Sequence, residues 1–263
     1  MRIFRRCLWD ERMTLLSWAG ILIAFALFAV STYEQLGQSP GLSTLMENLP
    51  PYMQALFGGL DWSTAQGYLN TELFSWLPLL IAFYTGLYGA SALSREVDSH
   101  TAETLLAQPI RRWSVVLAKF GVIVTGTFLL HLALYATVVP LVPVFIKGQS
   151  LAAGPTLLVT VSSFLTSLAV GSLALLISAM VNDQRKATVY ASGTIMLLFF
   201  VNVIGQISSK AKFLTRINPF GRYHSADILK TGGIAWGDAL FLIGFIALFL
   251  AASVWWFERK DIA

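Results

Sequence analysis

The side chains that can do chemistry inside a membrane are scarce in this chain of 263 residues. Of its three histidines, only His131 lies within a long apolar stretch, where a lone neutral imidazole is expected to hydrogen-bond a neighbouring helix. The single cysteine, Cys7, forbids an intrachain disulfide and lacks the spacing of a metal site. The sequence therefore predicts no catalytic residue and no metal centre.

The motifs of membrane enzymes and ATPases are also absent from the sequence. It has no His-Glu-x-x-His zinc motif, and Ser192–Gly193 lacks the Gly-x-Ser-Gly context of an intramembrane serine protease. No lysine follows a glycine, so the phosphate-binding loop Gly-x-x-x-x-Gly-Lys-Ser/Thr is missing. We expect a chain that is not an enzyme and holds no cofactor. If ATP drives its work, ATP and magnesium bind to a separate partner subunit.

The composition indicates an integral membrane protein. Hydrophobic residues make up 56% of the chain and charged residues 12%, about half the charged share of a typical globular protein. The mean hydropathy is +0.68. So few charges cannot cover so apolar a core in water, and most of the surface must face lipid. The net charge of +4 is small and scattered, which argues against a nucleic-acid partner.

The uncharged runs predict an all-α protein with six transmembrane helices in a single domain over residues 1–263. A spanning helix needs about 17–25 mostly apolar residues. Runs of this kind lie near 14–33, 73–92, 121–141, 155–180, 188–206 and 239–257. None of them contains Asp or Glu, which argues against transport coupled to protons or sodium.

The basic residues predict the orientation. Four arginines lie within residues 1–13, Lys and Arg are absent from 13–94, and four basic residues follow within 95–119. The positive-inside rule then places both termini in the cytoplasm of a multi-pass protein in the cell inner membrane. Residues 207–238 oppose this reading, because their five basic residues would lie outside.

The first thirteen residues are expected to form a short helix in the cytoplasmic headgroup layer. Ile3, Phe4, Cys7 and Leu8 recur at helical spacing, while arginines hold the other faces. The alternative is a basic flank that only anchors the first span.

Residues 94–119, between the second and third spans, carry the most information. Asp98 or Ser99 is expected to cap a short helix that runs through Leu106. Pro109 breaks that helix, and a second one begins near Ile110 and runs into the third span. This elbow exposes apolar side chains that a plain solvated loop does not need.

Three polar or small-residue patterns lie within the predicted spans. Asn202 and Gln206 share one helix face, either as interhelical bonds or as lining of a pathway. Tyr84 and Tyr88 form a second pair, for which core packing is the alternative to a pathway. The third pattern is a stripe of small residues that favours close helix packing: Ser163, Ser167 and Gly171.

The 94–119 segment resembles the cytoplasmic loop of ABC-2-type transporter permeases. The residues that match that loop are Glu96, Thr101, Glu103, Leu105, Leu106, Pro109, Arg112 and Lys119. The stretches 67–74 and Asn218–Phe220 also look like this family. His100 departs from the pattern, because a glycine usually precedes the threonine.

The resemblance implies the membrane-spanning permease subunit of an ATP-driven exporter, which forms the translocation pathway. Such a subunit pairs with a second copy of itself or with a related permease. It docks a cytoplasmic ATP-binding cassette subunit through a coupling helix between helices 2 and 3, to which Glu96, Thr101, Glu103, Leu105, Leu106, Pro109 and Arg112 are assigned. The family's last external loop often folds into short helices. The alternative function is a membrane sensor or immunity protein that binds a toxic lipid or peptide without moving it.

Overall fold

The computed structural model describes residues 2–37, 39, 41, 44, 48, 60–99 and 111–260. Its long helices are α2 (Arg12–Ser31), α7 (Leu77–Asp98), α9 (Arg112–Phe145), α10 (Ala153–Met180), α11 (Gln184–Ile207) and α14 (Trp236–Arg259). The short helices are α1 (Arg2–Asp10), α3 (Tyr33–Leu36), α6 (Ala65–Leu69), α12 (Lys212–Ile217) and α13 (Ser225–Thr231). The described residues also form a π-helical turn, η1 (Asn70–Phe74), and two 3-10 turns, η2 (Ser209–Ala211) and η3 (Pro219–Arg222).

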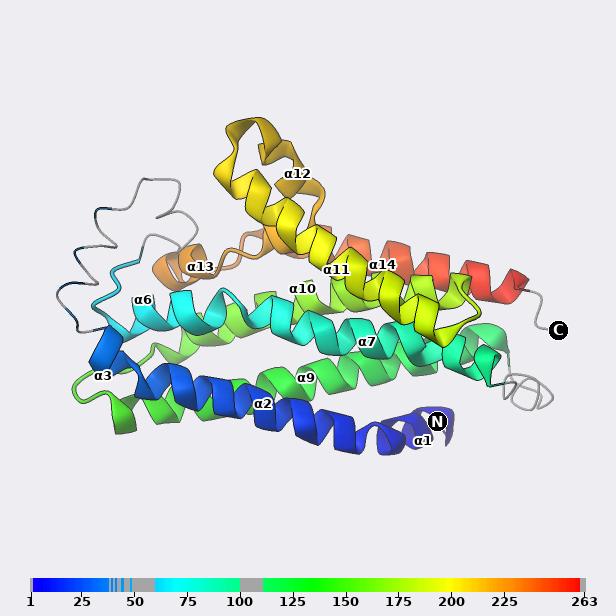
Figure 1. The fold of residues 1–263 in the computed structure, drawn as a ribbon, viewed down its shortest axis with the longest axis horizontal. Coiled ribbons are helices and arrows are strands. Elements are labelled where there is room, and N and C mark those ends of the chain that lie inside the picture. The colour runs from blue at the N-terminus through cyan, green and yellow to red at the C-terminus, as the bar shows by residue number, and fades with distance from the viewer. Residues whose placement is uncertain are drawn as a thin grey trace.

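Six helices in the described part of the chain are long and apolar enough to cross a membrane. No strand occurs among these residues, so the predicted all-α class with six spans is confirmed. The helices lie side by side along the long axis of the molecule (Figure 1). Helix α1, the last turn of α14, the end of α7 and the start of α9 share one end of the bundle, called here the terminal end (Figure 1).

Helices α7 and α10 form the centre of the bundle. Their most apolar windows are 72% and 67% buried, whereas those of the other four spanning helices are at most 28% buried. Small residues allow the two central helices to approach closely. A Cβ atom added to Gly89 of α7 would lie 3.0 Å from the backbone oxygen of Gly171 in α10. The hydroxyl of Thr85 donates a hydrogen bond to the Ser167 oxygen across the same contact (3.1 Å).

The segment after α7 differs from the sequence-based expectation. Helix α7 continues to Asp98, and Ser99 is its C-cap. The Ser99 hydroxyl donates back to the Arg95 carbonyl oxygen (2.7 Å), which satisfies one of the last acceptors of the helix. Helix α9 begins at Arg112, not at Ile110, after an extended Arg111. The expected short helix and Pro109 lie outside the described residues.

A π-helical turn precedes α7, and a proline lies in the first turn of α7. Pro78 has no N–H and leaves the Phe74 carbonyl, four residues before it, without a helical donor. Tyr223, from the distant stretch between η3 and α13, donates its hydroxyl to this oxygen (2.7 Å). Burial raises the pKa of Tyr223, so the hydroxyl keeps the proton that it donates. This hydrogen bond therefore connects the 207–238 segment to the second spanning segment.

Residues 207–238 fold into short helices, as the family resemblance implies. Asn218 begins η3 by accepting a hydrogen bond from the Phe220 N–H (3.0 Å), and its amide donates to the Leu198 oxygen in α11 (2.6 Å). Phe220 is buried against α7, α10 and α11. Gly232 ends α13 with a φ of 68°, which a residue without a Cβ adopts freely.

The close approach of α7 and α10 predicts that Gly89→Leu destabilises the protein. Its Cβ would also meet Ala174 Cβ at 3.1 Å, and the longer side chain would force the helices apart. We expect a loss of about 1–3 kcal/mol in the free energy of unfolding, read as a lower melting temperature in detergent. The matched control is Gly244→Leu in α14, where a Cβ meets no atom within 4 Å. Equal melting temperatures for the two variants would contradict this packing.

Candidate functional site

An ion pair joins the two helices on either side of residues 100–110. The Glu96 carboxylate of α7 lies 2.5 Å from the Lys119 ammonium of α9, and only 22% and 10% of these side chains are exposed. Cys7 of α1 lies beside the same lysine. The partial burial of both charges makes their pairing necessary, because an isolated ion in this environment is costly. The pair therefore fixes the spacing of α7 and α9 at the terminal end.

The last turn of α14 and Lys260, which follows it, contact the start of α9 and the end of α10. The Arg112 guanidinium, in the first turn of α9, donates to the backbone oxygens of Lys260 (2.6 Å) and Glu258 (3.3 Å). The Lys260 ammonium in turn donates to the oxygens of Ala179 (2.9 Å) and Val181 (3.2 Å) at the end of α10. A cation at a helix C-terminus satisfies free carbonyls and opposes the negative end of the helix dipole. Residues 258–260 are called here the C-terminal clasp.

The connection between α10 and α11 belongs to the same framework. The Asp183 carboxylate caps α11 by accepting from the Lys186 N–H (2.9 Å), and this bond lowers the pKa of Asp183. The first N–H of α11, that of Gln184, donates to the Asp98 carboxylate at the end of α7 (3.4 Å). The ends of α7, α9, α10, α11 and α14 are thus linked by polar contacts around the flanks of residues 100–110.

The N-terminal helix adds an amphipathic element to this end. Phe4, Cys7 and Leu8 of α1 pack on the core beneath it, and a Cβ at Gly121 of α9 would lie 3.3 Å from the Phe4 ring. Arg5 and Arg6 are exposed. The predicted helix is present, and its apolar side contacts its own chain. Its place in the headgroup layer stays a prediction.

The coupling residues predicted from the sequence divide into two groups. Glu96 and Arg112 are described, and each makes the contacts within the chain given above. Thr101, Glu103, Leu105, Leu106 and Pro109 lie outside the described residues, so their docking role stays a prediction.

The sequence pointed to His131 as the one ionisable residue within the spans and did not reveal that Lys119 is buried as well. Only 8% of the residue is exposed. The sequence feature that could have indicated this burial is Glu96, an opposite charge on the other flank of residues 100–110 with which Lys119 pairs.

The predicted pathway residues occupy different environments. Tyr84 and Tyr88 are buried, and Tyr84 packs edge-on against Trp18 of α2 with ring centroids 6.4 Å apart. These tyrosines therefore pack in the core. Asn202 is buried, whereas Gln206 is exposed, so the two amides do not form one polar surface in the single chain. Within the described residues, no hydrogen bond reaches the side-chain oxygen of Asn202.

His131 forms the expected bond to a neighbouring helix. Its Nδ1 lies 2.9 Å from the Thr127 oxygen and its Nε2 lies 3.0 Å from the Ser163 hydroxyl of α10. Because a carbonyl only accepts, Nδ1 carries the hydrogen, and Nε2 then accepts from the serine. Both nitrogens of a neutral imidazole are used, which leaves none for a ligand.

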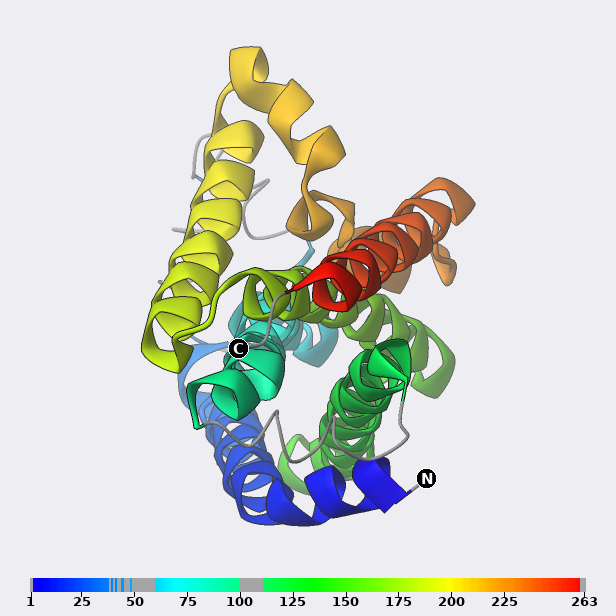
Figure 2. The same cartoon turned by 90° about the vertical axis from the view of Figure 1, so that its right-hand side faces the viewer.

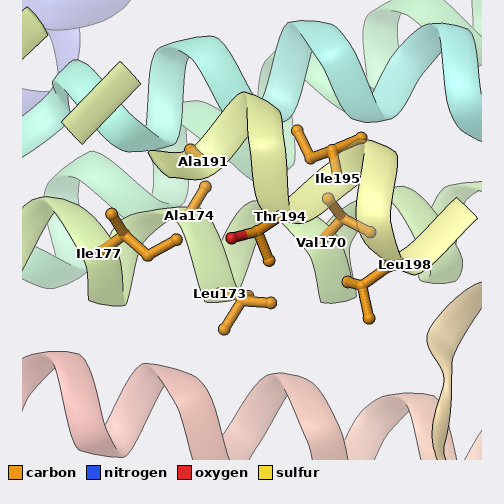
Figure 3. A pocket seen from close by; sticks show the side chains of 8 residues that line it. All are labelled: Val170, Leu173, Ala174, Ile177, Ala191, Thr194, Ile195 and Leu198. Carbon is orange, nitrogen blue, oxygen red and sulfur yellow. The ribbon is translucent and has the colours of Figure 1, made fainter. Parts of the chain in front are cut away.

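A shallow groove lies between part of α10 and α11 (Figure 3). It is lined by Val170, Leu173, Ala174, Ile177, Ala191, Thr194, Ile195 and Leu198. The one hydroxyl, that of Thr194, donates to the Tyr190 oxygen of its own helix (2.7 Å). The groove offers no free polar group for catalysis or for binding an ion. Among the described residues, no cluster of His, Cys, Asp and Glu suits a metal either.

The fold and this framework define a polytopic α-helical membrane protein whose polar contacts concentrate at the terminal end. The family model of the ABC-2 family transporter protein matches residues 8–262. The chain therefore belongs to the ABC-2 transporter family. A search of curated proteins found no significant match.

The burial of Lys260 predicts a pH dependence of stability. Burial lowers its pKa from 10.5 to about 8, so the unfolded chain binds more protons than the folded one between these values. The contribution of Lys260 to stability is therefore lost as the pH falls through about 8 and is fully present above the unfolded pKa. Relative to Lys260→Met, the wild type should gain melting temperature in detergent between about pH 7 and about pH 11. A constant difference between the two proteins would contradict the burial of the ammonium.

Proposed function

We propose that this chain is the permease subunit of an ATP-driven exporter and that a separate subunit binds ATP and magnesium. The family match over residues 8–262 carries the proposal. The missing phosphate-binding loop supports it, because a chain without that motif needs an ATPase partner. The chain itself is then not an enzyme.

The terminal end is the proposed docking face for an ATP-binding cassette subunit. The flanks of residues 100–110 are joined by the Glu96–Lys119 ion pair and by the Arg112 bonds to the C-terminal clasp. A force applied between these flanks would reach α7, α9, α10 and α14 through short polar contacts. This face also requires both termini in the cytoplasm, in agreement with the positive-inside pattern of residues 1–119.

A second permease copy, identical or related, is proposed to complete the translocation pathway. In the single chain, the groove between α10 and α11 is apolar. Helices α2, α11 and α14 expose most of their apolar surface. Asn202 and Gln206 remain the proposed polar lining, reached when two copies face each other.

The docking role predicts that changes within residues 100–110 separate the two subunits. The variant Glu103→Lys, Leu105→Ala, Leu106→Ala removes an apolar anchor and reverses a charge. We expect each lost interface leucine to cost about 1–3 kcal/mol, so ATPase co-purification should fall several-fold while membrane insertion is unchanged. Pull-down from mild detergent, with the bound ATPase quantified, measures the loss.

The matched control for this variant is Leu36→Ala, an exposed leucine of α3 at the opposite end of the bundle. It should leave ATPase recovery intact. If the triple variant co-purifies as much ATPase as the wild type and hydrolyses ATP at the same rate, the docking assignment is wrong. Failure of the wild type to recover any ATPase would instead favour the sensor or immunity function.

The proposed orientation predicts which thiols an impermeant reagent reaches. Thr231 at the end of α13 and Lys186 near the start of α11 are both exposed and belong to opposite ends of the bundle. In a Cys7→Ser background, Thr231→Cys should react with an impermeant maleimide in intact cells, and Lys186→Cys only after lysis. The reverse pattern would show that the termini lie outside.

A further inference from the structure

The tryptophans of α14 mark the two levels at which the bilayer surfaces cross the molecule. Trp236, at the start of this helix, is 83% exposed, and Trp255 near its end is 52% exposed. Their separation of 19 residues corresponds to about 28 Å along a helix, close to the thickness of a hydrocarbon core of about 30 Å. Tryptophan favours the interface between lipid and water. The level of Trp236 is therefore the interface opposite the terminal end.

Arg222 holds helix α12 at this level. Its guanidinium pairs with the Asp238 carboxylate in the first turn of α14 (3.1 Å) and also donates to the Arg216 backbone oxygen of α12. Asp238 follows Trp236 by two residues. His224 lies 3.2 Å from the other oxygen of Asp238, so this carboxylate is already occupied by two partners. Figures 1 and 2 show α12 projecting from the side of the bundle at the far end of α11.

The exposed surface of α12 carries an apolar stripe and a basic stripe side by side. Phe213 and Ile217, four residues apart, are 62% and 65% exposed. Lys212 and Arg216 are also four apart and exposed, and the exposed Lys210 precedes them in η2. Within the described part of the chain, no carboxylate pairs with these three cations.

We propose that α12 is an interfacial helix that binds the phosphates of anionic lipids, with Phe213 and Ile217 inserted among the acyl chains. A membrane surface fits both stripes at once: the apolar one enters hydrocarbon, and the basic one meets headgroup phosphates. The proposal also accounts for basic residues at the end opposite the termini. Arg222 is neutralised by Asp238, and the lipid neutralises Lys210, Lys212 and Arg216. It does not depend on the transport function.

The test is amide hydrogen exchange of α12 in the full-length protein in nanodiscs. One set contains phosphatidylcholine alone, and the other an equal mixture with phosphatidylglycerol. A surface of negative lipids favours each basic residue by a factor of about 5, so exchange in α12 should be at least about fivefold slower in the mixture. Raising the salt to about 1 M, where the Debye length is about 3 Å, should remove most of the difference.

The variant Lys210→Gln, Lys212→Gln, Arg216→Gln should lose the dependence on phosphatidylglycerol. The matched control, Arg185→Gln with Lys186→Gln, removes exposed basic residues from the other end and should keep it. Phe213→Ser should speed the exchange of α12 in both lipids. Unchanged exchange in α7 of each variant would show that the bundle is intact.

Three outcomes would overturn the proposal. Equal protection of α12 in both lipids would indicate cover by a second protein copy. Equal protection by inorganic phosphate in phosphatidylcholine nanodiscs would indicate an anion site unrelated to lipid. Retention of the phosphatidylglycerol effect in the triple variant would remove the role of these cations.

Discussion

Hydrocarbon supplies no hydrogen-bond partner, and this constraint shapes the interior of the bundle. Several polar groups at the centre find a partner on their own or a neighbouring helix, although the hydroxyls of Tyr84 and Tyr88 and the side-chain oxygen of Asn202 have none among the described residues. Thr85 donates to the Ser167 oxygen, and the hydroxyl of Ser178 in α10 accepts from the N–H of Leu93 (3.0 Å). Such contacts require α7 and α10 to lie almost backbone to backbone, which is why small residues line their interface. The other spanning helices pack around this pair.

Stronger polar contacts lie at the two ends of the bundle, where charges and carbonyls are present in excess. At the terminal end, Glu96–Lys119 and the C-terminal clasp link helix ends. At the opposite end, Gln149 donates to the Tyr33 hydroxyl (2.8 Å) and accepts from the Ala65 N–H (2.6 Å), which joins the α9–α10 connection to α3 and α6. Polar contacts therefore connect the helices at both ends of the bundle as well as between α7 and α10.

Under the proposed function, this distribution would allow movement to pass along the helices. Apolar contacts are non-directional, whereas the hydrogen bonds between α7 and α10 and the charged contacts at the ends hold specific neighbours. The π-helical turn before α7 is a point of weaker helix hydrogen bonding, and Tyr223 occupies the carbonyl that Pro78 leaves free. Under the proposed function, a change at the docking face would reach the last loop through α7 and this contact.

The sequence by itself determined the six spans and the family. Hydropathy is a property of continuous stretches, and a spanning helix forms its backbone hydrogen bonds within itself. The position of a span therefore does not depend on distant residues. The small stripe of Ser163, Ser167 and Gly171 was likewise sufficient to predict a close helix contact. The interhelical bond of His131 followed from the cost of an unpaired imidazole in lipid.

Only the tertiary structure decided which polar groups meet. Tyr223 and Phe74 are 149 residues apart, and Arg112 and Lys260 are 148 apart, so no local pattern pairs them. The continuation of α7 through Asp98 was also missed, because Asp and Ser favour helix starts, whereas here Ser99 bonds the Arg95 oxygen and Asp98 accepts from the Gln184 N–H of α11. Glu96 and Arg112, whose coupling role stays a prediction, contact Lys119 and the C-terminal clasp because the fold brings these distant segments together.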